Sequence, residues 1–119
     1  MDATDLTPAL VGREVLDAAG RHIGRLDSLY KDIDSTTVWF ASVSMIRRGR
    51  RRLVFVPLVD ARLDQASITL RCGEQLARRA PQTRPGRTLP DELEADLYRH
   101  YEIPYQRLAS GSSRLRLVP

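Results

Sequence analysis

The chain has 119 residues, of which 42% are hydrophobic and 29% charged, a length and composition typical of one globular domain and not of a disordered chain. A net charge of +4 permits attraction to nucleic acid, anionic lipid or an acidic protein, but requires none of them. The single cysteine, Cys72, excludes an internal disulfide and a cysteine-based zinc site. No apolar run reaches the roughly 20 residues of a membrane-spanning helix, and the first residues lack the apolar core of a secretory signal, so we expect a cytoplasmic protein.

After a lead-in over residues 1–11, residues 12–72 contain six short segments with the pattern of β-strands. They are GREVLD (12–17), RHIGRLDSLYKDI (21–33), TVWFASVSM (37–45), RLVFVPL (52–58), VDARLD (59–64) and QASITLR (65–71). In the second, Leu26 and Tyr30 break the parity set by Ile23 and Leu29, which predicts a bulge or bend. The fourth is apolar on both faces, which predicts a central strand. Six short strands with tight turns indicate a mainly β fold, either a small closed barrel or a sandwich.

A cluster of arginines precedes the fourth segment: Arg47, Arg48, Arg50, Arg51 and Arg52. One interpretation is a solvated hairpin tip that turns at Gly49, where the charges oppose strand-to-strand aggregation. The alternatives are a contact with phosphates of RNA or DNA, with an anionic lipid surface, or with an acidic protein. The absence of an aromatic residue between Phe40 and Phe55 counts against base stacking on a single-stranded nucleic acid.

Beyond residue 72 the hydrophobic period changes, and we expect a C-terminal helical extension over residues 73–105. CGEQLARRAP (72–81) predicts a short helical turn, and QTRPGRT (82–88) a linker. LPDELEADLYRHYEIP (89–104) predicts a helix with acidic residues in its first half and basic residues near its end. Leu93, Leu97 and Tyr101, widened by Tyr98, form an apolar stripe that packs on the barrel or on a second subunit. Residues 106–119 have the composition of a flexible tail.

No pattern of catalytic or metal-binding residues stands out. His22 and His100 are far apart in the chain, and neither is bracketed by acids or cysteines. Asp32 and Asp34 lack the later ligands of a calcium loop, and Cys72 has no base beside it in the sequence. We therefore expect no enzyme activity, no metal, no cofactor and no small-molecule substrate.

Several motifs, in order, resemble those of PRC-barrel domain proteins over residues 11–105: GREVLDAAGRHIGRLDSLYKD, VWFASVS, FVPLVDAR and LPDELEADLYRHYEIPY. The resemblance implies a small closed PRC-type β-barrel of about six strands with a C-terminal α-helix, as in stand-alone bacterial members. Related barrels in the H subunit of the photosynthetic reaction centre and in the ribosome maturation factor RimM contact other macromolecules without catalytic residues of their own. Two departures are the sequence MIRRGRRRL, where the family has a Gly- and Phe-containing loop, and the missing Ser-Pro before the final helix.

We therefore predict a non-catalytic protein-binding adaptor, homodimeric, that recognises an unidentified protein partner through its barrel surface and C-terminal helix. The arginine cluster would steer anionic partners, and the candidate interface residues are Trp39, Leu97, Tyr98, His100, Tyr101 and Tyr105. The alternatives are an RNA- or ribosome-associated binding protein that uses the arginine cluster, and a peripheral adaptor at an anionic membrane surface.

Overall fold

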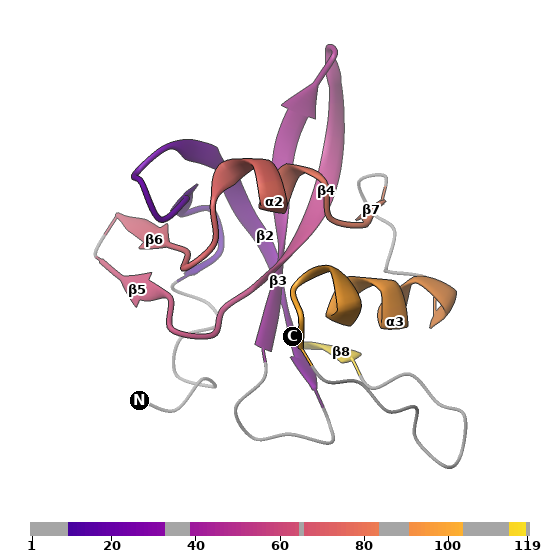
Figure 1. Cartoon of the computed structure of the whole chain (residues 1–119). Helices are drawn as coiled ribbons and strands as arrows, with labels where there is room; N and C mark the ends of the chain where they lie inside the picture. The colour runs from indigo at the N-terminus through magenta and orange to yellow at the C-terminus, as the bar shows by residue number, and fades with distance from the viewer. Residues whose placement is uncertain (1–9, 33–38, 65, 84–90, 104–114, 119) are drawn as a thin grey trace.

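The computed structural model describes residues 10–32, 39–64, 66–83, 91–103 and 115–118 (Figure 1). Two helices are present in this part of the chain, α2 (Glu74–Arg78) and α3 (Asp91–His100), together with eight strands. The strands are β1 (Glu14–Leu16), β2 (His22–Asp32), β3 (Trp39–Arg47), β4 (Arg50–Pro57), β5 (Arg62–Leu63), β6 (Ser67–Thr69), β7 (Gln82–Thr83) and β8 (Leu115–Val118). Each of the six segments expected between residues 12 and 72 overlaps one strand, so the mainly β prediction is confirmed.

All eight strands belong to one sheet, which is not closed into a barrel. Its path runs β5-β6-β1-β2-β3-β4-β7, with β8 paired to β2 off this path. The expected closed barrel is therefore wrong. The terminal strands β5 and β7 have two residues each and lie at opposite sides of the molecule (Figure 1), so no ladder joins them.

The long meander β2-β3-β4 is the centre of the sheet. The β2–β3 register shifts between Leu26 and Ser28, where the predicted parity change occurs. Both Leu26 and Leu29 are consequently buried, although they differ by an odd number of positions. β4 is buried on both faces from Leu53 to Val56, as expected of a central strand.

Two apolar cores cover the two faces of this meander. The larger core joins Val43 and Val54 to residues of β1, β2, β6 and α2. The smaller one joins Phe40 and Phe55 to α3 and β8. Since successive strand residues point to opposite faces, Val54 and Phe55 contribute to different cores. None of the helices in the described segments is long and apolar enough to span a bilayer.

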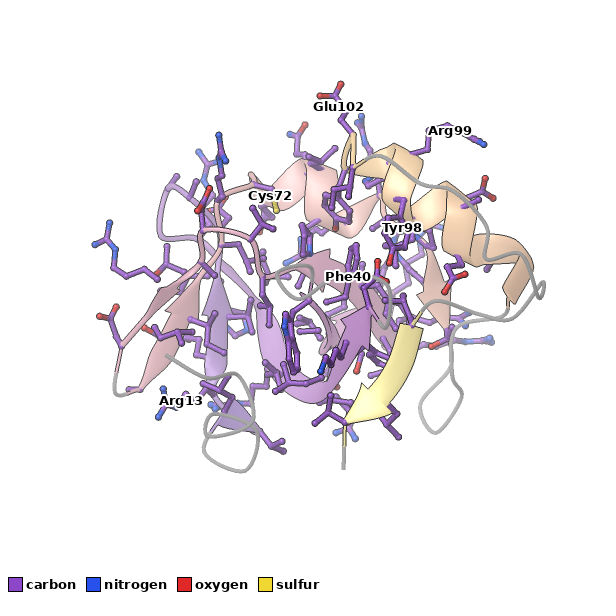
Figure 2. All side chains as sticks on the ribbon, turned by 90° about the horizontal axis from the view of Figure 1, so that it is seen from below. Arg13, Phe40, Cys72, Tyr98, Arg99 and Glu102 are labelled. Atoms are coloured by element: carbon purple, nitrogen blue, oxygen red, sulfur yellow. The ribbon has the colours of Figure 1, made fainter. Side chains whose placement is uncertain are left out.

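Helix α3 packs on the sheet of its own chain. Leu97 and Tyr98 have no exposed surface, and Glu94 is 2% exposed, so the buried face is rotated slightly from the predicted stripe, whose Leu93 is half-buried. Figure 2 shows Tyr98 directed from α3 toward Phe40, and the two ring centroids are 5.2 Å apart. Aromatic contacts of this kind add stabilisation beyond the area that they bury.

Two strands lie in segments that the sequence analysis assigned to a linker and a flexible tail. β7 pairs with Leu53 and Val54 of β4. β8 pairs antiparallel with residues 29–32 of β2, and Leu115 donates its backbone N–H to Glu94 Oε1 at 2.8 Å. The tail is therefore ordered over Leu115–Val118, because Leu115 completes the core under α3.

Candidate functional site

The arginine cluster lies at the end of the β3–β4 hairpin, which projects beyond the rest of the sheet (Figure 1). Arg47 pairs with Arg50 across a two-residue turn, in which both Arg48 (φ 52°) and Gly49 (φ 75°) have positive φ. This is the signature of a type I′ turn, whose twist matches that of the flanking strands. The expected hairpin with its turn at Gly49 is confirmed.

The hairpin end is a free two-stranded ribbon. The last residue of β3 that pairs with β2 is Ser44, and β7 reaches only Leu53 of β4. Residues 45–52 therefore have no neighbouring strand on either side within the described part of the chain. At about 3.3 Å per residue, the four steps from Ser44 to Arg48 carry the tip roughly 13 Å past the last three-stranded row.

The five guanidinium groups of the ribbon have no carboxylate partner in the described structure. Arg47, Arg48, Arg50 and Arg51 are exposed, and Arg52 is half-buried. The cross-strand pairs place Arg47, Arg50 and Arg52 on the face shared with Met45, and Arg51 on the opposite face with Ile46. Ile46 is itself 73% exposed, so the ribbon presents an apolar side chain among uncompensated positive charges.

Gly24 lies where the pairing of β2 with β3 ends, and there the two backbones are in close contact. A Cβ atom built on Gly24 would lie 2.2 Å from the carbonyl oxygen of Ser44 and 2.8 Å from Val43 Cγ1. Only glycine allows the two backbones to come this close. From here β2 continues toward its partner β1, and β3 continues alone into the ribbon.

A groove of about 340 Å³ lies where the two strands part. Its lining includes residues of β2, the edge of β3, and three arginines from different elements: Arg25 (β2), Arg51 (β4) and Arg78 (α2). Arg78 donates to Glu74 Oε2 and to the His22 carbonyl, both at 3.3 Å. Arg25 donates to the Gly12 carbonyl at 3.0 Å. Among the described residues, Glu74 pairs with one of the three arginines, and Glu14 bonds His22, which also lines the groove, at 3.0 Å. Sequence reasoning missed Arg25 and Arg78, since no local pattern links them to the ribbon.

The predicted interface residues lie mainly inside the molecule. Leu97 and Tyr98 are fully buried, and the Tyr98 hydroxyl donates to Asp32 Oδ2 at 2.7 Å. This corrects the expectation that they form a contact surface. Tyr101 donates its hydroxyl to the Phe55 carbonyl at 2.7 Å, and burial raises the pKa of Tyr101 well above its usual value.

The remaining interface candidates are less enclosed. Trp39 is half-buried at the start of β3, and its carbonyl accepts the Leu58 N–H at 2.9 Å. His100 Nε2 donates to the Leu76 carbonyl at 2.5 Å. The His100 ring packs edge-on against the Tyr101 ring, with 4.9 Å between the ring centroids. Tyr105 lies outside the described residues. The structure thus gives the C-terminal helix a packing role and leaves the ribbon as the exposed charged feature.

Asp17 is a buried charge that the sequence analysis did not single out. Burial opposes its ionisation, but its carboxylate accepts the backbone N–H groups of Ala19, Arg21 and Glu74 at 2.7–2.9 Å. Together with the positive charge of Arg21, these bonds outweigh burial and hold the pKa of Asp17 below its usual value. Asp17 therefore fastens α2 to the β1–β2 turn and helps to place Arg78 beside the groove.

Cys72 is half-buried, and burial raises the pKa of its thiol, with a smaller contribution from Asp17. A raised pKa keeps the thiol protonated, which is the opposite of an activated nucleophile. Among the described residues, no group of three or more His, Cys, Asp or Glu side chains could hold a metal ion.

Comparisons with known proteins found no relatives: no family model matches the chain, and no curated protein or solved structure matches it.

Proposed function

We propose that this chain is a non-catalytic binding module of the PRC-barrel type, and that its contact surface for an acidic protein partner is the arginine ribbon, residues 45–52. The observation that carries the proposal is the projection of five arginines without acidic partners on a ribbon that, within the described chain, pairs with no strand outside its own hairpin. The family relationship rests on the order of the sequence motifs, three of which overlap β1 to β4.

The turn geometry supports a role for the ribbon beyond folding. Arg48 occupies the left-handed region, which costs a non-glycine residue about 1 kcal/mol. Asparagine would suit this position of a type I′ turn better. An arginine here adds charge to the tip at the expense of stability, and such local conflicts concentrate at functional sites.

Direct binding measurements test the proposal. The test variant changes Arg47, Arg48, Arg50, Arg51 and Arg52 to Ser, and a charge-matched control changes five arginines that are exposed elsewhere, Arg21, Arg62, Arg71, Arg79 and Arg99. The probes are labelled poly-glutamate, a short RNA duplex and vesicles with and without anionic lipid. At about 0.5 kcal/mol for each exposed ion pair, loss of the ribbon charges weakens poly-glutamate binding about 70-fold.

The control variant loses the same net charge, so a nonspecific effect weakens both variants equally and contradicts the proposal. RNA is the second candidate, because exposed arginines without acidic partners can bind phosphate groups independently of sequence. Binding of RNA but not of poly-glutamate would favour it, and binding to anionic vesicles alone would favour a peripheral adaptor.

The homodimer and the cytoplasmic location both remain predictions from the sequence. Leu97 and Tyr98 cannot contribute to the dimer interface while α3 is packed as described. Sedimentation equilibrium at micromolar concentration tests the dimer, since a single species of 13.5 kDa would contradict it.

A further inference from the structure

The β3 edge of the ribbon is able to pair with another strand. Arg47 and Arg50 flank the two-residue turn, so the Arg47 carbonyl accepts the Arg50 N–H. Hydrogen-bonding direction alternates along an antiparallel strand, and Ile46 therefore directs its N–H and C=O away from β4. Ser44 shows the same direction, because its carbonyl faces Gly24 of β2. At Ile46 no β2 residue is paired, and these backbone groups face the groove.

The groove beside this edge has the charge of a site for acidic side chains. Arg51 lies on the same face of the ribbon as Ile46, and it has no acidic partner among the described residues. Arg78 lies on the other face, where its Nη1 is 3.9 Å from Met45 Sδ. A strand placed along this edge would therefore meet the unpaired Arg51 on one face, with Ile46 as an apolar contact, and Arg78, which Glu74 partly neutralises, on the other.

We propose that an extended acidic segment of the partner protein binds in this groove by adding a strand to β3 along Met45–Arg47. The inference rests on the proposed function and specifies the form of its partner. Main-chain hydrogen bonds supply affinity in this mode of recognition, and side-chain contacts supply specificity. Phosphate contacts of a nucleic acid would use the arginines but neither the free edge nor the exposed Ile46. A second copy of the chain would bring its own arginines to the same edge, and the like charges would repel.

The decisive variant is Ile46→Pro, which removes the outward N–H and leaves all five ribbon arginines unchanged. Proline is tolerated where an edge strand directs its N–H to solvent, so we expect the hairpin to fold. Ile46→Val is the matched control, since it keeps the N–H and a β-branched side chain. The probe is a fluorescein-labelled peptide of alternating Glu and Val, measured by fluorescence anisotropy. A second peptide of the same sequence carries an N-methyl group at every peptide bond, so that neither of its edges can pair.

We expect Ile46→Pro to weaken peptide binding at least about tenfold and Ile46→Val to change it less than about twofold. The N-methylated peptide should bind the wild-type chain as weakly as the unmodified peptide binds Ile46→Pro. The comparison of the N-methylated with the unmodified peptide is made on the wild-type chain, so it holds even if Ile46→Pro fails to fold.

Each contrary outcome has a distinct meaning. If Ile46→Pro binds the peptide as tightly as the wild-type chain does, or if the wild-type chain binds the two peptides equally, strand addition is overturned. If the five-arginine variant has lost peptide binding in that case, the proposed function still stands. Equal peptide binding by the wild-type chain and the five-arginine variant overturns the proposed function itself. If the chain binds an RNA duplex more tightly than the peptide, and Ile46→Pro leaves the RNA binding unchanged, the ligand is a nucleic acid and not an acidic strand.

Discussion

Among single replacements of a described glycine by alanine, Gly24→Ala should destabilise the fold most. The new Cβ would lie 2.2 Å from the Ser44 carbonyl oxygen, and an ordinary contact between such atoms is about 1 Å longer. The obstacle is backbone in the middle of the sheet, so no side-chain rotation relieves it. β2 and β3 must move apart at the Arg25–Ser44 pair.

Overpacking of this kind costs about 1–3 kcal/mol, and we expect Gly24→Ala to reach the upper end because a backbone pair is lost as well. Urea unfolding followed by circular dichroism measures the free energy of unfolding; with a slope of about 1.5 kcal/mol/M, the midpoint falls by about 2 M. Gly73→Ala is the control, since a Cβ on Gly73 meets nothing within 4 Å. A change below about 0.5 kcal/mol for Gly24→Ala would refute the close approach of the two strands.

Three further predictions concern stability. Arg48→Asn should raise the free energy of unfolding by about 0.5–1 kcal/mol, because asparagine adopts positive φ more readily before Gly49; an unchanged urea midpoint would contradict the type I′ turn. Tyr98→Phe should lower it by about 1–3 kcal/mol by removing a donor to the buried Asp32, whereas a neutral result would mean that this bond adds nothing. The lowered pKa of Asp17 means that its carboxylate stabilises the fold above the unfolded-state pKa of 3.8, and that this stabilisation is lost as pH falls below it. Asp17→Asn should therefore be less stable than the wild type at pH 7 and converge with it in acid; a constant difference down to pH 2 would contradict this.

Local patterns were sufficient to predict the elements whose causes are local. Alternation located six strands, the parity change at Leu26 located the bulge of β2, and Gly49 located the hairpin turn. The helix over 91–100 followed from its apolar spacing. In each case the residues that decide the structure are neighbours in the chain.

Features that depend on distant pairing could not be predicted in this way. β7 has two residues, too few to show any period, and β8 follows a Ser-Gly-rich segment and pairs with a strand more than 80 positions earlier. The family resemblance led to a closed barrel, but closure depends on whether terminal strands meet, which no local pattern reports. For the same reason the arginines of the ribbon were visible in the sequence, whereas Arg78 became part of the site only through the position of α2.

Protection against aggregation is the simplest alternative explanation of the arginine ribbon, and it accounts for only part of the geometry. Charges on a free strand edge do deter pairing with copies of the same chain. Protection against aggregation does not, however, explain a 73% exposed isoleucine on that edge or an arginine at a turn position with positive φ. The edge keeps its backbone hydrogen-bonding groups and carries an apolar contact, and it repels positive charge. It therefore discriminates between partners, because it excludes copies of the same chain and admits an acidic strand. Selectivity of this kind accounts for the arginines, the free edge and Ile46 together.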